Sequence, residues 1–144
     1  MNKFSLILSA AVLVFCLNAC GNAKKNSAQL ADKYWKLTEL NGAPVEEGQS
    51  AKEPHIILDN QNLRLSGNAG CNVITGAYQL TKPGKITFLP IAATQMMCLN
   101  MEIENQFLKI FESVEGYTIN GDVLTFVDAK KTPLARFTTN PPSE

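Results

Sequence analysis

Two stretches of the chain bring together residue types that could do chemistry. Residues 66–72 read Ser-Gly-Asn-Ala-Gly-Cys-Asn and place Cys71 in a run of glycine and asparagine, which tolerate tight turns. Residues 94–98 read Thr-Gln-Met-Met-Cys and end in Cys98, just before a helix-like segment. The two cysteines could form a disulfide that pins two loops together, or they could be two buried free thiols, since free cysteine is often buried. These two stretches alone leave both interpretations open.

The sequence gives little support for catalysis. It contains no Gly-x-Ser-x-Gly, no His-Glu-x-x-His and no phosphate-binding loop. A hydrolase triad would need its only histidine, His55, beside a nucleophile, and Ser66 is no more than a guess for that role. His55 is better interpreted as a surface or rim residue at a strand start, and Asp59 and Asp128 as turn residues. We therefore predict no catalytic residue and no enzymatic activity.

Metal binding is the other chemistry to consider. Met96, Met97 and Met101 cluster near Cys98, and thioethers can bind Cu(I). A methionine-rich patch is more often adaptable packing, and the two thiols suit a disulfide better than a metal centre. We predict no metal site and no cofactor.

The first residues of the chain are typical of an export signal. Lys3 supplies positive charge, and residues 4–17 form an apolar run, shorter than the ~20 residues of a spanning helix. The run ends in Leu-Asn-Ala-Cys at residues 17–20, which resembles a bacterial lipobox. That resemblance implies cleavage before Cys20 and a diacylglycerol on its sulfur; the alternative is an ordinary secretory signal cut after Ala19. We predict a lipoprotein with a signal peptide at residues 1–19.

Lipidation of Cys20 would anchor the chain to a membrane, because each buried methylene contributes about 0.8 kcal/mol. The following Gly21-Asn22 lacks an aspartate after the lipidated cysteine, which in a Gram-negative host favours the outer membrane. Either face of that membrane is possible. With Cys16 removed and Cys20 lipidated, Cys71 and Cys98 remain as an even pair in an oxidising compartment. This arithmetic favours the disulfide.

Composition indicates one small domain. Residues 20–31 are small and polar and are expected to form a flexible tether, while residues 32–140 suit a single core. Basic and acidic side chains are balanced at 13 each, and Lys24-Lys25 and Lys130-Lys131 are isolated pairs rather than a basic stripe. Nucleic acid is therefore an improbable partner, and we expect a monomer.

Short alternating segments predict strands at residues 34–40, 55–59, 63–67, 76–80, 85–88, 117–119, 123–127 and 133–138, with an edge segment at 43–45. Asn-Gly pairs at 41–42 and 120–121 predict tight hairpin turns. One helix is expected between Asn100 as cap and Gly116 as stop, because apolar residues recur there with helical spacing. These are Ile103, Phe107, Ile110, Phe111 and Val114. We predict a mostly β, α+β fold: a small antiparallel β-barrel-like sheet with one packed helix.

Landmarks spread over residues 34–137 resemble the META domain, the heat-shock-associated HslJ-like family. They are Trp35, Leu37, Leu40, Gly67, Gly70-Cys71-Asn72, Gly76, Tyr78, Thr94, Met97-Cys98, Phe107 and Leu124. The resemblance implies a compact barrel-like fold, an envelope or secreted location and a disulfide between Cys71 and Cys98. Members are associated with heat-shock induction and novobiocin tolerance, and a protozoan relative with virulence, but the family's molecular activity is not established.

Two classes of function follow. The first is a non-enzymatic envelope lipoprotein that binds another protein or supports the envelope under stress. The second is a small-ligand binder, since barrels can hold apolar molecules. A barrel interior filled by Trp35, Phe88, Phe107, Phe111 and Phe126 would argue against the second class.

Overall fold

The computed structural model describes residues 29–139 of the chain. The predicted signal peptide, Cys20 and most of the predicted tether lie outside this range. The packed domain begins slightly before the predicted boundary, because Leu30 and Ala31 are buried and the Trp35 indole Nε1 donates a hydrogen bond of 2.7 Å to Leu30 O. The last residues of the predicted tether are therefore part of the domain.

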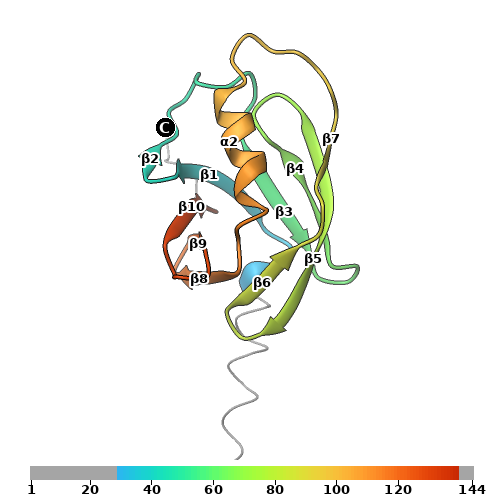
Figure 1. Cartoon of the computed structure of the whole chain (residues 1–144), viewed down its shortest axis with the longest axis vertical. Helices are drawn as coiled ribbons and strands as arrows, with labels where there is room; N and C mark the ends of the chain where they lie inside the picture. The colour runs from blue at the N-terminus through green and yellow to red at the C-terminus, as the bar shows by residue number, and fades with distance from the viewer. Residues whose placement is uncertain (1–28, 140–144) are drawn as a thin grey trace, which may run out of the picture.

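The described residues fold into strands and the helix α2 (Figure 1). The elements are β1 (Tyr34–Leu40), β2 (Ala43–Pro44), β3 (His55–Asp59), β4 (Arg64–Asn68), β5 (Val73–Lys82), β6 (Lys85–Phe88), β7 (Ala92–Ala93), α2 (Glu102–Ile110), β8 (Gly116–Asn120), β9 (Val123–Val127) and β10 (Pro133–Thr138). Most of them coincide with the predicted segments. β5 is longer than expected, and β7 was not predicted.

Eight of the strands close into an antiparallel barrel. They follow the order β10-β9-β8-β6-β5-β4-β3-β1, and β10 also pairs with β1. β2 extends beside β1, and β7 pairs with β5 beyond the end of β6. The predicted mostly β fold with a barrel-like sheet and one packed helix is thus confirmed.

The two Asn-Gly pairs behave differently. Asn41 and Gly42 form the predicted two-residue turn, with φ of 51° and 81°, as a type I′ turn requires. The second prediction is wrong by one residue, because Asn120 pairs with Val123 and the turn consists of Gly121 and Asp122. The observed register places Tyr117 opposite Phe126 and Ile119 opposite Leu124. Pairing of these apolar side chains sets the register.

Helix α2 begins one residue later than predicted and ends earlier. The N-cap residue is Met101 rather than Asn100, although the Asn100 side-chain Oδ1 accepts a hydrogen bond of 3.1 Å from the Glu102 N–H. The α-helix stops at Ile110 rather than near Gly116, and the chain continues in a turn in which Val114 N donates to Ile110 O. Phe111 and Val114 remain buried because that turn continues the same apolar face.

The barrel interior is filled by large side chains. Trp35, Leu37, Phe107, Phe111 and Phe126 are at most 4% exposed, as predicted for the core. The phenylalanine rings of the core form a connected cluster, in which Phe88 meets Phe111 at 4.9 Å and Phe126 meets Phe137 at 5.1 Å between ring centroids. Edge-to-face contacts of this kind add to the free energy gained by burial.

Candidate functional site

The predicted disulfide is present. Cys71, in the loop between β4 and β5, is bonded to Cys98, in the segment that enters α2, and their Cα atoms are 6.1 Å apart. This separation lies in the usual range of about 4.4–6.8 Å. Cys71 is fully buried, so the bond joins the inner loop to the outer segment.

The side chain of Asn72 holds the same two segments together through hydrogen bonds. Its Oδ1 accepts from Thr94 Oγ1 and from the Met96 N–H, both at 2.7 Å. Its Nδ2 donates to Met96 O at 3.1 Å and to a Glu104 carboxylate oxygen at 2.6 Å. The Gly-Cys-Asn and Thr-Gln-Met-Met-Cys stretches therefore meet, as the sequence suggested. Their contacts are a disulfide and hydrogen bonds that hold the two segments together, and we call this region the joint.

Glu104 completes the joint and was missed by the sequence analysis. It is 3% exposed, and its Oε2 accepts from the backbone N–H groups of Cys71 at 2.9 Å and Asn72 at 2.7 Å. A buried carboxylate needs such donors, and its loss would leave them unpaired. The sequence did contain a signal for this burial: Glu104 precedes Phe107 by three residues, which puts an acid on the apolar face of the helix.

Beyond this joint the chain presents apolar side chains to solvent. Met96 is 47% exposed, and Met97 and Leu99, which flank the bonded Cys98, are almost fully exposed at 96% and 110%. Because Cys98 is tied to Cys71 and the Asn100 Nδ2 donates to Gln49 O, the loop is held at both sides of these residues. In residues 29–139 no group of three His, Cys, Asp or Glu is placed to hold a metal ion.

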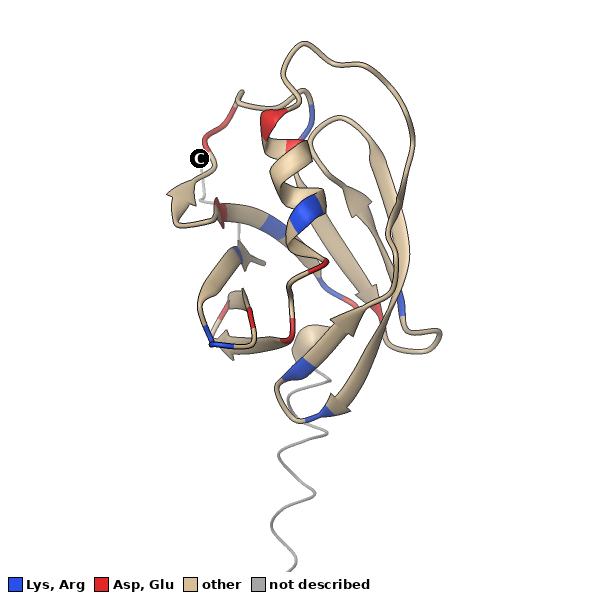
Figure 2. Ribbon diagram, in the orientation of Figure 1, with Lys and Arg blue, Asp and Glu red and all other residues tan. Residues whose placement is uncertain are grey.

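These residues belong to a longer stretch without charge, residues 86–101, which we call the uncharged strip. It has no Asp, Glu, Lys or Arg. Figure 2 shows it as an uninterrupted tan path from β6 along β7 to the start of α2. The loop before α2 lies at the opposite end of the molecule from the first described residues (Figure 1). At the end with the first described residues, the Asp32 N–H donates to Leu58 O, near the end of β3. Cys71 lies at the other end, because it follows β4, whose last residue pairs with His55 at the start of β3.

A surface groove of about 500 Å³ lies between the strip and α2. The strip contributes Phe88, Leu89, Pro90 and Ile91, and the helix side contributes Asn105, Leu108, Lys109, Phe111 and Glu112. Leu89 is 45% exposed, while Ile91 and Leu108 are half-buried. The groove is thus apolar along its floor and polar at its helix rim.

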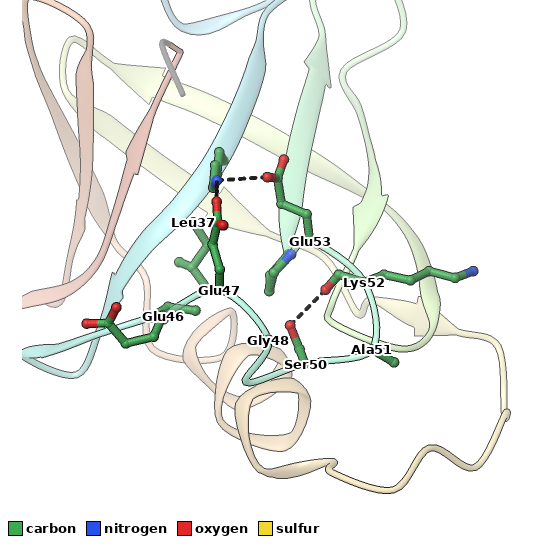
Figure 3. A pocket seen from close by; sticks show the side chains of 11 residues that line it. Leu37, Glu46, Glu47, Gly48, Ser50, Ala51, Lys52 and Glu53 are labelled. Atoms are coloured by element: carbon green, nitrogen blue, oxygen red, sulfur yellow. Dashed lines mark hydrogen bonds and ion pairs between the residues drawn. The ribbon is translucent and has the colours of Figure 1, made fainter. Parts of the chain in front are cut away.

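A second, smaller pocket of about 210 Å³ lies between β1 and the loop of residues 46–54 (Figure 3). Lys36 Nζ lies 2.9 Å from Glu53 and 3.3 Å from Glu47, and its side chain is only 14% exposed. The hydrogen bond to Glu53 raises the pKa of Lys36. Lys36, Glu47 and Glu53 are therefore paired with one another and fasten the loop to β1.

His55 lies at the strand start, as expected, and takes part in this cluster. Its ring stacks on Tyr34 at 4.3 Å, and its Nδ1 lies 3.0 Å from Glu53 O. The Tyr34 hydroxyl donates to Glu53 at 2.7 Å, and burial together with this bond raises the pKa of Tyr34. Ser66 pairs with Ile57 rather than with His55, so the structure forms no hydrogen-bonded His–Ser pair among the described residues.

Asp59 and Asp128 are turn residues, as expected. Asp59 Oδ1 accepts from the N–H groups of Gln61 at 2.7 Å and Asn62 at 2.9 Å. Asp128 Oδ1 accepts from Lys130 N–H at 2.9 Å and Thr132 N–H at 2.7 Å. The backbone bond from Asn62 lowers the pKa of Asp59, and that from Thr132 lowers the pKa of Asp128. Both carboxylates therefore stabilise turns in their ionised form.

One glycine among the sequence landmarks is required by close packing. A Cβ on Gly67 would collide with the backbone carbonyl of His55 in the neighbouring strand, so a larger residue there would push β3 away from β4. A Cβ on Gly76 would meet only the flexible end of the Ile91 side chain, which can turn aside.

Comparison with known proteins gives a family and a fold. The META domain model matches residues 28–141. One solved structure, determined by NMR, has 26% identity, covers 78% of this chain and 93% of its own, and superposes with a TM-score of 0.60. An NMR structure from Burkholderia xenovorans has 20% identity, covers 81% and 88%, and has a TM-score of 0.62. A DUF4847 family protein from Bacteroides vulgatus has 15% identity, covers 79% and 96%, and has a TM-score of 0.55.

No curated protein matched the chain. Within residues 29–139, no helix has both the length and the apolar character needed to span a bilayer.

Proposed function

The chain belongs to the META domain family, and we propose that it is a non-enzymatic lipoprotein of the cell envelope whose domain binds another protein. The lipid on Cys20 anchors the chain, most plausibly in an outer membrane, and the binding supports the envelope under stress or antibiotic exposure. The observation that carries this proposal is the contrast between a filled barrel interior and the exposed, uncharged strip.

The filled interior favours protein binding over the alternative of a ligand held inside the barrel. Trp35, Phe107, Phe126 and Phe137 are each fully buried at 0% exposure. A ligand site inside a barrel needs an open space of a few hundred Å³, and here that space is taken by aromatic rings. The hollows of comparable volume that the described residues line are on the surface.

The exposed strip is the better candidate for contact with a partner. Soluble proteins rarely expose neighbouring large apolar side chains without a function for them. Met97 and Leu99 are fixed on either side of a disulfide, so presenting them costs little further conformational entropy on binding. Their position, at the far end from the first described residues, leaves them free to face away from an anchoring membrane.

The anchor can be tested with a matched pair of cysteine variants. Cys20→Ala should abolish incorporation of radiolabelled fatty acid and move the protein from the detergent phase to the aqueous phase, or leave it uncleaved. Cys16→Ala lies in the same predicted signal segment and should change neither result. Unchanged detergent-phase partitioning of Cys20→Ala would refute the lipid anchor.

Partner binding can be tested by photo-crosslinking in living cells. A photoreactive amino acid at Met97 or Leu99 should give a discrete heavier product, whereas the same amino acid at Thr118, exposed on β8, should not. Deletion of the gene should lower novobiocin tolerance, and the wild-type chain should restore it better than Met97→Lys with Leu99→Lys. Equal crosslinking at all three positions, or equal rescue, would contradict a specific role of this surface.

A further inference from the structure

The barrel has one seam where strand pairing nearly fails. β6 and β8 share a single residue pair, Lys85 with Gly116, flanked by the bonds from Ile86 N–H to Glu115 O and from Tyr117 N–H to Gly84 O. Beyond this pair the chain leaves β8 and leads through the turn of residues 111–115 back to α2. The remainder of the β6–β7 edge faces the groove instead of a strand.

The direction of the backbone groups along this edge follows from the observed bonds. Leu89 N–H bonds Ala77 O, and Thr94 N–H bonds Val73 O, so Leu89 and Thr94 direct their groups toward β5. Because N–H and C=O alternate in direction along a strand, Phe88 and Ala93 direct theirs away from β5. Phe88 lines the groove itself, and Ala93 lies two residues beyond Ile91, the last groove residue on this edge. Within residues 29–139, neither of these two N–H groups has a hydrogen-bond partner in the protein.

This edge has a proline and a short strand, but it lacks the charged side chains that usually protect an edge against pairing with another chain. Proteins blunt free strand edges with charged side chains, with proline or by keeping them very short. The other open edge, β2, follows that rule, since it has only two residues, includes Pro44 and leads into Glu46 and Glu47. The β6–β7 edge has Pro90 at its centre, but it carries no charge from Ile86 onward.

The opposite wall of the groove decides what can bind there. α2 and its following turn stand across the groove from the edge with Leu108, Lys109 and Phe111, and the groove between them has a volume of about 500 Å³. A space of this volume suits one extended segment and is far too small for a second folded barrel. Binding of this kind gains affinity from main-chain hydrogen bonds and specificity from side-chain pockets.

We propose that the groove between the β6–β7 edge and α2 binds an extended, predominantly apolar peptide segment of a partner protein as an added β-strand. The backbone of the peptide pairs with the outward groups of Phe88 and Ala93, and an apolar side chain packs on Ile91 and Leu108. This inference rests on the proposed function, because it assigns a binding mode to the protein interaction proposed above.

The test uses peptides of defined sequence, since the partner is not identified. A phage library of random dodecapeptides is selected against the purified full-length chain, and the enriched peptides are synthesised. We expect segments with alternating apolar residues, and hydrogen exchange of the Phe88 and Ala93 amides that slows when the peptide is added. Peptide affinity is then measured by fluorescence anisotropy against three variants.

Two variants alter the groove. Ala93→Pro removes an outward N–H without breaking a hydrogen bond to β5, although it also fixes φ next to the core, and it should weaken peptide binding at least about tenfold. Leu108→Glu places a charge on the opposite wall and should have a similar effect. Val123→Glu, on the exposed face of β9, is the control and should stay within about twofold of the wild-type affinity.

Failure of the inference can be told apart from failure of the proposed function. If no peptide is enriched, or if both groove variants bind enriched peptides as tightly as the control does, the strand-addition site is refuted. Crosslinking at Met97 or Leu99 would in that case still support protein binding by another part of the strip. If Ala93→Pro does not fold, Leu108→Glu and the exchange of the Phe88 amide in the wild-type chain still decide the result.

Discussion

The barrel is closed at two places, and the two closures are built in different ways. Between β1 and β10 the backbone pairing is extensive, with Lys36, Leu37, Glu39 and Leu40 each opposite a partner residue, and the Arg136–Glu39 ion pair at 2.8 Å crosses it. Between β6 and β8 one residue pair is formed. We refer to these regions as the closed side and the seam.

At the seam, side chains and a covalent bond do what backbone pairing does on the closed side. Helix α2 covers the gap, Phe111 packs its ring on Phe88, and the start of the helix is fixed by the Cys71–Cys98 disulfide and by Glu104. This arrangement leaves a strand edge available next to an apolar groove. The comparison indicates that a gap in a sheet can be stable when its walls are anchored elsewhere.

The largest expected effects come from removing an aromatic ring on either side. Phe137→Ala on the closed side and Phe111→Ala at the seam should each reduce the free energy of unfolding by about 3–5 kcal/mol through cavity formation. The loss should be smaller for Phe111, because the adjacent groove allows neighbouring side chains to relax. Chemical denaturation measures both values, and a loss below ~1 kcal/mol for Phe111→Ala would contradict its role in the core.

Removing the disulfide should have the next largest effect. The chain-entropy estimate for the loop between Cys71 and Cys98 is about 3.5 kcal/mol. The double variant Cys71→Ala with Cys98→Ala should lose stability of this order yet remain folded, since Asn72 and Glu104 still join the same segments. Reduced wild-type protein is the control. Freely alkylated thiols in the native oxidised protein would refute the bond.

Loss of the Glu104 carboxylate should cost somewhat less. Glu104→Gln turns one acceptor oxygen into a donor facing other donors, and it should reduce the free energy of unfolding by about 1–3 kcal/mol. Glu102→Gln, on the same helix but exposed, is the matched control and should cost less than ~1 kcal/mol. Equal losses in the two variants would show that Glu104 does not anchor the seam.

Acid should give the smallest effect, and Asp128 carries the part of it that acts next to the closed side. Asp128, in the turn between β9 and β10, has a lowered pKa in the folded protein because of the Thr132 N–H. Its stabilising contribution is present above the unfolded pKa of about 3.9 and is lost as the pH falls toward the folded value. The free energy of unfolding should therefore fall below about pH 4, and less steeply in Asp128→Asn than in wild type.

Hydrogen exchange can locate this acid effect. Amides of β9 and β10 should exchange faster as the pH falls through that range, after correction for the intrinsic rate, while amides of α2 should change less. A larger increase in exchange for the α2 amides than for the β9 and β10 amides would contradict this difference between the closed side and the seam.

The sequence predicted most strands because their signal is local. Residues 34–40, 55–59, 85–88, 123–127 and 133–138 are short runs of strand-forming residues, several of them next to turn residues, and the structure has strands with these same bounds. Residue types and turn signals of this kind are read within one segment, so no knowledge of its neighbours is needed. The buried aromatic core and the cysteine pair could be predicted for the same reason, from residue type and spacing.

Other features were decided by contacts between distant segments. The turn at Gly121 and Asp122 was displaced from Asn120 because pairing of Tyr117 with Phe126 outweighed the local turn preference. β7 was missed because Ala92 and Ala93 carry no alternating pattern and form a strand only beside β5.

The sequence by itself therefore determined the family, the barrel class, the core and the disulfide, all of which depend on residue types and their local order. The tertiary structure alone decided that Glu104 is a buried anchor and that the β6–β7 edge lies open beside α2. Both depend on which strands become neighbours, and strand order is set by the closure of the whole sheet. Closure joins segments that are far apart in the chain, so a pattern within one segment cannot predict it.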